Sequence, residues 1–347
     1  MNDGLYMKRC LESASAGEGY TVPNPMVGAV LVYDGKIIGE GNHREYGALH
    51  AEANAINQVV DKLLLKACTL YVNLEPCCHF GKQTPCTERI IEAGIPRVVI
   101  GTSDPFPSVN GKGISLLRNA GIEVITGVSE EESRELNRFF FAYHEKNRPY
   151  IFFKWAQTSD GYIDIIRDSS SPPAEISGRA EHIMAHKWRA TCQAVLAGTN
   201  TVIADNPRLT AREWHGKNPL RVTIDRNGRL NSRYAVFDDS ASSLIFVSEK
   251  NSKKANYGKN AEIVVLRDED NVEESIIGEL YSRQIQSLMI EGGTMLIESF
   301  VKKNLWDEAR VFVSEKTFGS GIPAPVINKK ARTCEKTPEG ILLTYRN

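Results

Sequence analysis

Four side chains in the first quarter of the chain have the types and the spacing of a catalytic zinc site: His50, Glu52, Cys77 and Cys86. One imidazole and two thiols supply three ligands for a tetrahedral zinc and leave the fourth position for water, as a catalytic rather than a structural site requires. Zinc lowers the pKa of its bound water to about 7, and a nearby carboxylate can carry the proton to a leaving amine. We therefore predict one catalytic Zn²⁺ per chain, with His50, Cys77 and Cys86 as ligands and Glu52 as the proton carrier.

The surrounding pattern predicts elements that could present these side chains together. Helical spacing over 50–60 puts His50 and Glu52 in a first turn, where backbone amides have no partner inside the helix. A strand over 69–73 leads to Cys77, and a helix over 84–93 begins beside Cys86. The other elements expected in this half are a helix over 3–16, a hairpin of 27–33 and 36–40, strands over 97–101 and 122–126, and a helix over 114–119. Alternating strands and helices imply a sheet covered on both faces.

Each of these residues alone has a simpler explanation, because a histidine and a glutamate are common on helix surfaces and cysteines are common as buried thiols. Their combination, with a proline before both Cys77 and Cys86, favours the metal site. Cys78 is interpreted as a neighbour rather than a ligand, since a fourth protein ligand would occupy the position of the water. A purely structural zinc module is the alternative, and it fits three ligands and a nearby glutamate poorly.

Composition limits the class of protein. The chain has 347 residues, which favours two domains, with 41% hydrophobic and 24% charged residues as in ordinary globular proteins. A formal net charge of −1 argues against nucleic acid or a membrane surface as a partner. The seven cysteines are an odd number, and five of them precede residue 87, which indicates metal binding rather than a disulfide framework. We find no segment typical of a signal peptide or a transmembrane helix, so a cytoplasmic protein is expected.

The domain boundary is predicted near residues 146–149, where a charged helix over 129–145 ends before a proline and an apolar strand begins. The expected domains are 1–146 and 147–347. The second half should contain strands over 150–156, 194–197, 220–225, 243–247, 262–266 and 287–290, and helices over 177–190, 272–281 and 294–302, with Ser177 as a helix cap. Two glycines, Gly292 and Gly293, lie between a strand and a helix, where the backbone can approach a phosphate. They are not the three-glycine dinucleotide fingerprint, so we do not predict a Rossmann fold.

The first half resembles the deaminase half of the bifunctional deaminase/reductase family of riboflavin biosynthesis. The resemblance rests on the turn at 23–28, the His50-Ala51-Glu52 triplet, the block 74–86, and the segments 104–105 and 110–113. The eight residues between the two cysteines set it apart from cytidine and tRNA adenosine deaminases. The resemblance implies a cytidine-deaminase-like α/β/α domain that hydrolyses the 2-amino group of a phosphorylated pyrimidine, 2,5-diamino-6-(5-phosphoribosylamino)pyrimidin-4-one. It also implies that Asn24, His79 and Lys82 hold this substrate.

The second half resembles the reductase of the same family at 154–161, 197–210 and 291–293. The resemblance implies a dihydrofolate-reductase-like α/β domain that uses NADPH to reduce the ribosyl group to ribityl. The residues expected at the cofactor are Gln157, Thr201, Asp205, Gly292 and Gly293. Those expected at the substrate are Arg189, Leu209, Arg212 and Glu291, and Lys154 and Asp205 are the candidates for polarising the sugar carbon that receives hydride.

One segment departs from the family pattern. The run Ala174-Glu175-Ile176-Ser177 stands where many members have a glutamine-tryptophan-isoleucine-threonine run at the cofactor. A glutamate there would repel the 2′-phosphate of NADPH. This departure supports one alternative, a deaminase with a degenerate reductase domain. A separate alternative from another class is an RNA base deaminase, which the near-neutral charge disfavours. The family resemblance suggests association into a homodimer or homotetramer.

Overall fold

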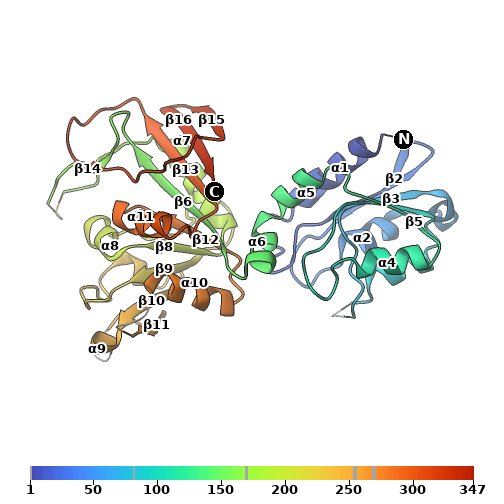
Figure 1. Ribbon diagram of the computed structural model, residues 1–347, viewed down its shortest axis with the longest axis horizontal. Helices are drawn as coiled ribbons and strands as arrows, with labels where there is room; N and C mark the ends of the chain where they lie inside the picture. Colours follow the sequence, from blue (N-terminus) through green and yellow to red (C-terminus); the bar gives the residue numbers. More distant parts are fainter. Residues whose placement is uncertain (1, 81–82, 169–170, 253–255, 268–270) are drawn as a thin grey trace. The chain divides into compact units, whose positions relative to one another are not determined.

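The structure is a computed structural model that describes residues 2–80, 83–168, 171–252, 256–267 and 271–347. The chain divides into two compact units, Met1–Asn147 and Arg148–Asn347 (Figure 1). The predicted boundary after residue 146 lies one residue from this division. No helix among the described residues has the length and the apolar character needed to cross a bilayer.

The first unit is built on a five-stranded sheet with the order β2-β1-β3-β4-β5. The strands are β1 Gly28–Tyr33, β2 Lys36–Asn42, β3 Thr69–Leu74, β4 Arg97–Thr102 and β5 Glu123–Thr126. Strand β1 runs antiparallel to both β2 and β3, whereas β3, β4 and β5 are parallel. The predicted hairpin and strands are therefore present, with boundaries shifted by one or two residues.

Helices cover both faces of this sheet, as the alternation of strands and helices predicted (Figure 1). One face carries α1 Asp3–Ser15 and α5 Glu130–Leu136, and the other carries α2 Ala51–Gln58, α3 Cys86–Glu92 and α4 Lys112–Asn119. Successive side chains of β1 point to opposite faces: Ala29 and Leu31 join the core beneath α2, whereas Val30 and Val32 join the core beneath α1. A 3-10 helix, η1 Lys62–Ala67, precedes β3.

The prediction of a single helix over 129–145 is wrong. This segment forms two helices, α5 and α6 Arg138–Lys146, which are separated at Asn137. The Asn137 side chain accepts a hydrogen bond from Met26 N at 2.7 Å and donates one to Met26 O at 2.9 Å. Asparagine forms such local polar contacts readily and is a weak helix former, so the tertiary contact interrupts the helix.

The second unit is built on a nine-stranded sheet with the order β11-β10-β9-β8-β12-β6-β13-β16-β15. The strands are β6 Tyr150–Gln157, β8 Ala194–Ala197, β9 Leu220–Ile224, β10 Ser243–Ser248, β11 Ala261–Leu266, β12 Ser287–Glu291, β13 Glu308–Ser314, β15 Thr333–Thr337 and β16 Gly340–Arg346. The sheet is parallel from β11 to β13, and β16 and β15 complete it in antiparallel fashion. A separate short pair joins β7 Tyr162–Asp164 to β14 Ile322–Pro323.

Helices pack on both faces of this sheet as well. They are α7 Arg179–Thr191, α8 Thr199–Asp205, α9 Glu249–Ser252, α10 Val272–Ser282 and α11 Thr294–Lys302, with the 3-10 helix η2 Ala235–Phe237. Val311 of β13 belongs to the apolar core that contains α10 and α11 side chains. The next residue, Phe312, faces the opposite side and stacks on Trp188 of α7 with ring centroids 5.4 Å apart.

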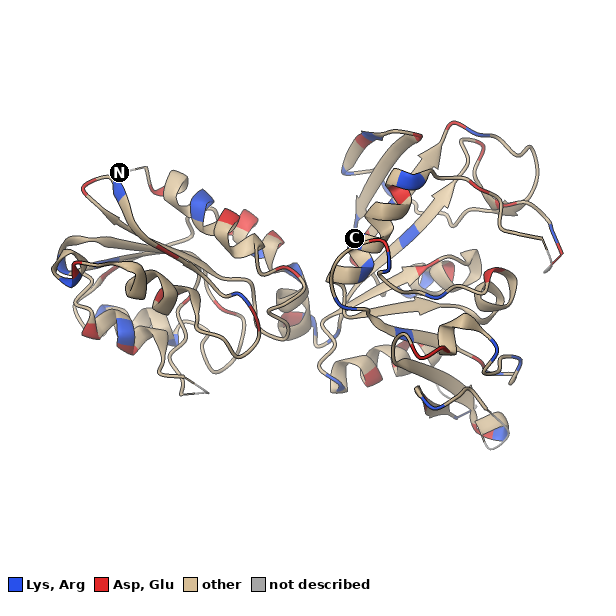
Figure 2. Ribbon diagram, turned by 180° about the vertical axis from the view of Figure 1, so that it is seen from behind, with Lys and Arg blue, Asp and Glu red and all other residues tan. Residues whose placement is uncertain are grey.

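Helix α7 begins after Gly178 rather than after the predicted cap Ser177. The Glu181 carboxylate accepts a hydrogen bond from Gly178 N at 3.1 Å, and so satisfies a backbone donor at the start of the helix. Figure 2 shows that acidic and basic residues are interspersed along the helices of each unit. Such mixed charge agrees with the net charge of −1 and does not favour a polyanionic partner.

Candidate functional site

The three predicted metal ligands lie together in the first unit. His50 Nδ1 is 3.5 Å from Cys77 Sγ and 3.3 Å from Cys86 Sγ. A tetrahedral zinc with bonds of about 2.1 Å to nitrogen and about 2.3 Å to sulfur would place these atoms roughly 3.5 Å apart. Among the described residues, these three form the one group of histidine, cysteine and acidic side chains spaced to hold a metal ion. The donor set and its spacing therefore fit zinc.

Each ligand comes from the end of a different element. His50 precedes the first residue of α2 in an extended conformation, so it is the helix cap rather than part of the predicted first turn. Cys77 follows β3, and Cys86 is the first residue of α3. The backbone N–H of Cys86 also donates to Cys77 Sγ at 3.4 Å, and hydrogen bonds from Cys86 and His50 lower the pKa of the Cys77 thiol. A thiolate is the form of cysteine that binds metal.

The loop after β3 is fixed by the buried Glu75. Its carboxylate accepts backbone hydrogen bonds from Asp104 at 3.2 Å, Gly111 at 2.9 Å and Ile114 at 3.1 Å. A Cβ atom on Gly113 would lie 2.3 Å from Pro76 O, so α4 packs directly against the residue that precedes Cys77. Sequence analysis gave Glu75 no role, although it lies in the motif, because nothing in the pattern indicated which amides it would meet.

Glu52 is buried in the first turn of α2, with 3% of its surface exposed. Burial raises the pKa of its carboxyl group, and the neighbouring Cys77 charge adds to this effect. When the pKa of a carboxyl group is raised, it moves closer to the pH at which the enzyme works, and the group can then both accept and return a proton. The position two residues after His50 therefore has the burial that the predicted role requires.

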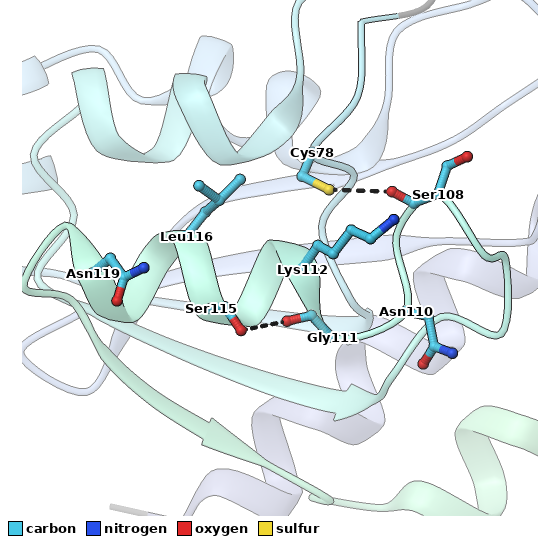
Figure 3. Close-up of a pocket in the computed structure, with 8 residues that line it drawn as sticks. All are labelled: Cys78, Ser108, Asn110, Gly111, Lys112, Ser115, Leu116 and Asn119. Atoms are coloured by element: carbon cyan, nitrogen blue, oxygen red, sulfur yellow. Dashed lines mark hydrogen bonds between the residues drawn. The ribbon is translucent and has the colours of Figure 1, made fainter.

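Cys78 does not belong to the group of three metal-binding side chains. Its thiol donates to Ser108 O at 3.5 Å, at the side of a pocket of about 690 Å³ beside the start of α4 (Figure 3). The pocket is lined by Cys78, Ser108, Asn110, Gly111, Lys112, Ser115, Leu116 and Asn119. The structure thus agrees with the interpretation of Cys78 as a neighbour of the metal site.

Asn24 is linked to the metal ligand His50 by a residue that sequence analysis did not single out, His43. The Asn24 amide nitrogen is 3.1 Å from His43 Nε2, and the buried His43 ring lies edge-on to the His50 ring, 5.4 Å between centroids. His43 follows the hairpin without a motif of its own, so no sequence signal distinguished it. Asn73 fixes the adjoining turn, since it accepts from Gly28 N at 2.8 Å and donates to Met26 O at 3.1 Å.

The other predicted deaminase residues lie on the loop between the two cysteines. His79 is exposed, and its ring is 5.7 Å from the ring of Phe106, which in turn lies 5.3 Å from His144 of α6. Lys82 lies outside the described residues. The role of both residues in substrate binding stays a prediction.

The second unit contains a cavity of about 870 Å³ that brings together most of the predicted reductase residues. Those that line it are Lys154, Arg189, Thr201, Asp205, Leu209, Glu291, Gly292 and Gly293. The two glycines adopt positive φ angles of 64° and 70°. A Cβ atom on Gly293 would lie 2.9 Å from Thr201 Oγ1, so the turn needs glycine to pack against α8. The two other predicted residues, Gln157 and Arg212, are not among the lining residues.

Gln157 and Arg212 have other contacts. Trp155 Nε1 donates to Gln157 Oε1 at 2.8 Å, and the half-exposed Arg212 lies 3.9 Å from the Glu213 carboxylate. Their assignment to cofactor and substrate therefore stays a prediction without support from the cavity.

Arg189 and Glu291 form a nearly buried, bidentate ion pair. Arg189 Nε and Nη2 donate to the two carboxylate oxygens at 2.5 and 2.6 Å, and Nη1 donates to Thr210 O at 3.2 Å. Burial acts to raise the pKa of Glu291, but the charge and hydrogen bonds of Arg189 outweigh it and leave the pKa below its usual value. Lys154 lies opposite Glu291 in the register of β6 and β12, and burial lowers the pKa of its amine.

Asp205 carries a partner that sequence analysis missed. Arg167 donates a short hydrogen bond to Asp205 and pairs with Asp164 at 2.7 Å, and its side chain is only 5% exposed. Burial raises the pKa of Asp205, and Arg167 opposes the rise. Arg167 lies in a loop with no regular pattern, so its contact could not be inferred from the sequence.

The segment that departs from the family pattern does reach the cavity. Ala174, Glu175, Ile176 and Ser177 all line it. The backbone carbonyl of Glu175 accepts a hydrogen bond from Lys316 Nζ at 2.8 Å, whereas its side chain is exposed. The substitution is thus located on the wall of the cavity.

Comparisons with known proteins match both units. The family described as RibD C-terminal domain matches residues 149–341, and the cytidine and deoxycytidylate deaminase zinc-binding region matches residues 1–102. The riboflavin biosynthesis protein RibD of Aquifex aeolicus (strain VF5) is 43% identical over 321 residues, which are 92% of this chain and 89% of that protein. The RibD protein of Escherichia coli (strain K12) is 31% identical over 92% of this chain and 89% of its own length.

A solved structure is similar over almost the whole chain. It is a diaminohydroxyphosphoribosylaminopyrimidine deaminase/5-amino-6-(5-phosphoribosylamino)uracil reductase from Thermotoga maritima, with a TM-score of 0.89, 39% identity, and coverage of 99% of this chain and 98% of that one. The first unit thus contains a deaminase-type zinc-binding region and the second a RibD C-terminal domain, and the predicted fold class is confirmed.

Proposed function

Because this chain belongs to the RibD family of riboflavin biosynthesis enzymes, which join a deaminase to a reductase, we propose that it acts twice on one precursor. The first unit deaminates 2,5-diamino-6-(5-phosphoribosylamino)pyrimidin-4-one, and the second reduces the ribosyl group of the product to ribityl with NADPH. The observation that carries the proposal is the cluster of His50, Cys77 and Cys86, with donor atoms 3.3–3.5 Å from the imidazole nitrogen.

In the first unit, His50, Cys77 and Cys86 would hold the metal. Zinc, when bound, lowers the pKa of a water ligand to about 7 and so provides a nucleophile near neutrality. Glu52 takes a proton from the attacking water and returns it to the amine, which leaves as ammonia. Burial of Glu52 supports this role, since it raises the pKa of the carboxyl group toward the range where both transfers are favourable.

In the second unit, the substrate and cofactor would share the cavity. NADPH, when bound, supplies the hydride for the sugar carbon. Lys154 is the candidate for polarising that carbon, because burial lowers the pKa of its amine toward the range in which a lysine exchanges protons. Arg167 holds the second candidate, Asp205, in one orientation. Arg189 and Glu291 would bind the substrate, and a bound phosphate would compete with Glu291 for the guanidinium group.

Mass spectrometry of the products formed from the diaminopyrimidinone ribosyl phosphate with NADPH tests the proposal. We expect a product that is both deaminated and reduced. A deaminated but unreduced product would refute the reductase assignment and favour the degenerate-reductase alternative. Unchanged substrate from zinc-replete protein would refute the deaminase assignment. Cytoplasmic location, which was expected from the sequence pattern, and assembly into a homodimer or homotetramer, which the family resemblance suggests, both remain predictions.

A further inference from the structure

Arg167 joins two acidic residues on the wall of the second unit's cavity without lining the cavity itself. Its side chain is only 5% exposed, and its guanidinium group is bound on several sides. Nε donates to Asp164 Oδ2 at 2.7 Å, and Nη2 donates a short hydrogen bond to Asp205 Oδ1. Nη1 donates to Ser171 O at 2.7 Å and to Ala204 O at 3.2 Å. Three of these partners line the cavity, namely Asp164, Ala204 and Asp205.

Asp205 lies where a carboxylate is electrostatically unfavourable. It is the last residue of α8, where the final backbone carbonyls of a helix carry partial negative charge. Arg167 meets both charges, since it binds the Asp205 carboxylate and the carbonyl of Ala204. Burial raises the pKa of Asp205, the hydrogen bond and the charge of Arg167 lower it, and the charge of Asp164 raises it. The ionised form of Asp205 therefore depends on Arg167.

Two described charged side chains act on Asp205, and they are Arg167 and Asp164. Arg208, three residues further along the chain, lies 3.9 Å from Asp238 instead. The other ionisable residues that line the cavity do not contribute to the pKa of Asp205; they are Lys154, Glu175, His182, Arg189, Arg229 and Glu291. The charge state of this carboxylate is thus set from the side of Arg167.

Only one of the two carboxylate oxygens of Asp205 is engaged. Oδ1 accepts the hydrogen bond from Arg167, whereas Oδ2 has no hydrogen bond or ion pair with a described residue. An ionised carboxylate is purely an acceptor, so its second oxygen can bind an O–H or N–H group of a ligand. The proposed substrate and cofactor both carry ribose hydroxyl groups, which donate hydrogen bonds of this kind.

We propose that Arg167 is a positioning residue of the reductase site, which holds one carboxylate oxygen of Asp205 and so presents the other to a hydroxyl group of the bound ligand. Arg167 does not line the cavity, so it acts through Asp205 rather than on the ligand. Protonation of Asp205 would break the ion pair and leave a weaker acceptor. Arg167 therefore determines how far reduction persists toward low pH. This inference rests on the proposed reductase function.

The test is the pH profile of kcat/KM for NADPH oxidation by the full chain with the deaminated substrate, from about pH 4.5 to 9, because this profile reports the ionisation of groups in the free enzyme. Arg167→Met should move the acid limb of the profile to higher pH, since burial then acts on Asp205 without its counter-charge. The rate at the optimum should fall roughly tenfold to hundredfold, as expected when a positioned group is displaced by about 1 Å.

Two further variants separate positioning from a loss of folding. Asp164→Asn should move the acid limb in the opposite direction, to lower pH, because the charge of Asp164 raises the pKa of Asp205. Arg167→Lys should restore the position of the acid limb but only part of the rate, since an ammonium group keeps the charge without the planar fork of donors. A purely structural role for Arg167 predicts neither the opposite shift nor the partial rescue.

Arg148→Met is the matched control. Arg148 forms a nearly buried, bidentate ion pair with Asp307 in the same unit, and neither residue lines the cavity. This variant should lower the Tm of the second unit and leave the acid limb unmoved.

The possible outcomes distinguish the inference from the function beneath it. If Arg167→Met oxidises NADPH with the acid limb of wild type, the inference is wrong while the reductase function holds. If Arg167→Met does not fold, the other two variants decide, and a wild-type acid limb in Asp164→Asn refutes the inference. If the wild-type chain itself oxidises no NADPH, the reductase function fails.

Discussion

Replacing Arg189 by methionine should lower the free energy of unfolding of the second unit. The size of the loss can be worked out from the burial and the hydrogen bonds of the ion pair between Arg189 and Glu291. The Arg189 and Glu291 side chains are only 12% and 10% exposed, and they share two hydrogen bonds. Removing one member of a buried pair costs about 3–5 kcal/mol, because the other charge is left without a partner. We expect about 3 kcal/mol, at the low end, since the cavity beside Glu291 can admit water.

Differential scanning calorimetry of the full chain measures this effect. For a unit of this size, about 3 kcal/mol corresponds to a fall in Tm of roughly 6–12 °C for the transition of the second unit. The double variant Arg189→Met/Glu291→Met should recover most of the loss, because an apolar pair of similar volume leaves no charge buried. Zinc-dependent deamination should be unchanged in both variants and serves as the control for the first unit.

The pH dependence of the single variant provides a second check. Without Arg189, burial raises the folded-state pKa of Glu291 above its unfolded value of about 4.3. The folded variant then binds more protons than the unfolded chain, so its stability rises as the pH falls from 7 toward 5. The difference in Tm from wild type should therefore shrink over this range. Equal Tm values for the single and double variants at pH 7 would refute the reasoning, because Glu291 would then not be an unpaired charge.

Three further results are expected. Cys86→Ser should lose bound zinc in metal analysis, whereas Glu52→Gln should keep the zinc and lose deamination by roughly a hundredfold to ten-thousandfold; full activity of Glu52→Gln would contradict its role. Gly28→Ala should destabilise the first unit by about 3 kcal/mol in urea titration, since the new Cβ would lie 2.1 Å from a backbone carbonyl of α1; Gly4→Ala, whose Cβ has room inside α1, is the matched control and should not destabilise. Burial lowers the folded-state pKa of His186 to about 4, so wild type should lose stability relative to His186→Gln as the pH falls from about 6.5 to 4; parallel Tm curves for the two proteins would contradict this.

The deaminase site was the part of the molecule that local sequence could predict best. The sequence periodicity of the elements in this region is clear, and four side chains lie at the ends of these elements: His50, Glu52, Cys77 and Cys86. Their proximity could therefore be predicted from the sequence. The support of that site was harder to foresee. Glu75 and His43 act through contacts with backbone amides and with a ring from other loops, and such contacts leave no periodic signal.

The second unit was less predictable for physical reasons. Burial does not alternate along strand β13, since two buried residues are followed by one intermediate residue and five of its seven residues are buried. Sequence analysis proposed no element after residue 302. Helix α8 contains threonine, asparagine and valine, which are weak helix formers, and its place was not predicted. Arg167 reaches Asp205 from an irregular loop. The segment 174–177 was noticed because it departs from the family pattern, but its position on the cavity wall was known only from the structure.

Strand β15 is one of the two edge strands of the nine-stranded sheet, and its charges bear on how the protein should behave at high concentration. A strand at an edge exposes backbone groups that can pair with a strand of another molecule, which is a common start of aggregation. Four of the five residues of β15 are exposed, and Glu335 and Lys336 place opposite charges side by side on it. Stacking a second copy against this edge would desolvate both charges. Salt screens these charges. We therefore expect the protein to aggregate more readily when it is concentrated in high salt than when it is concentrated at low ionic strength.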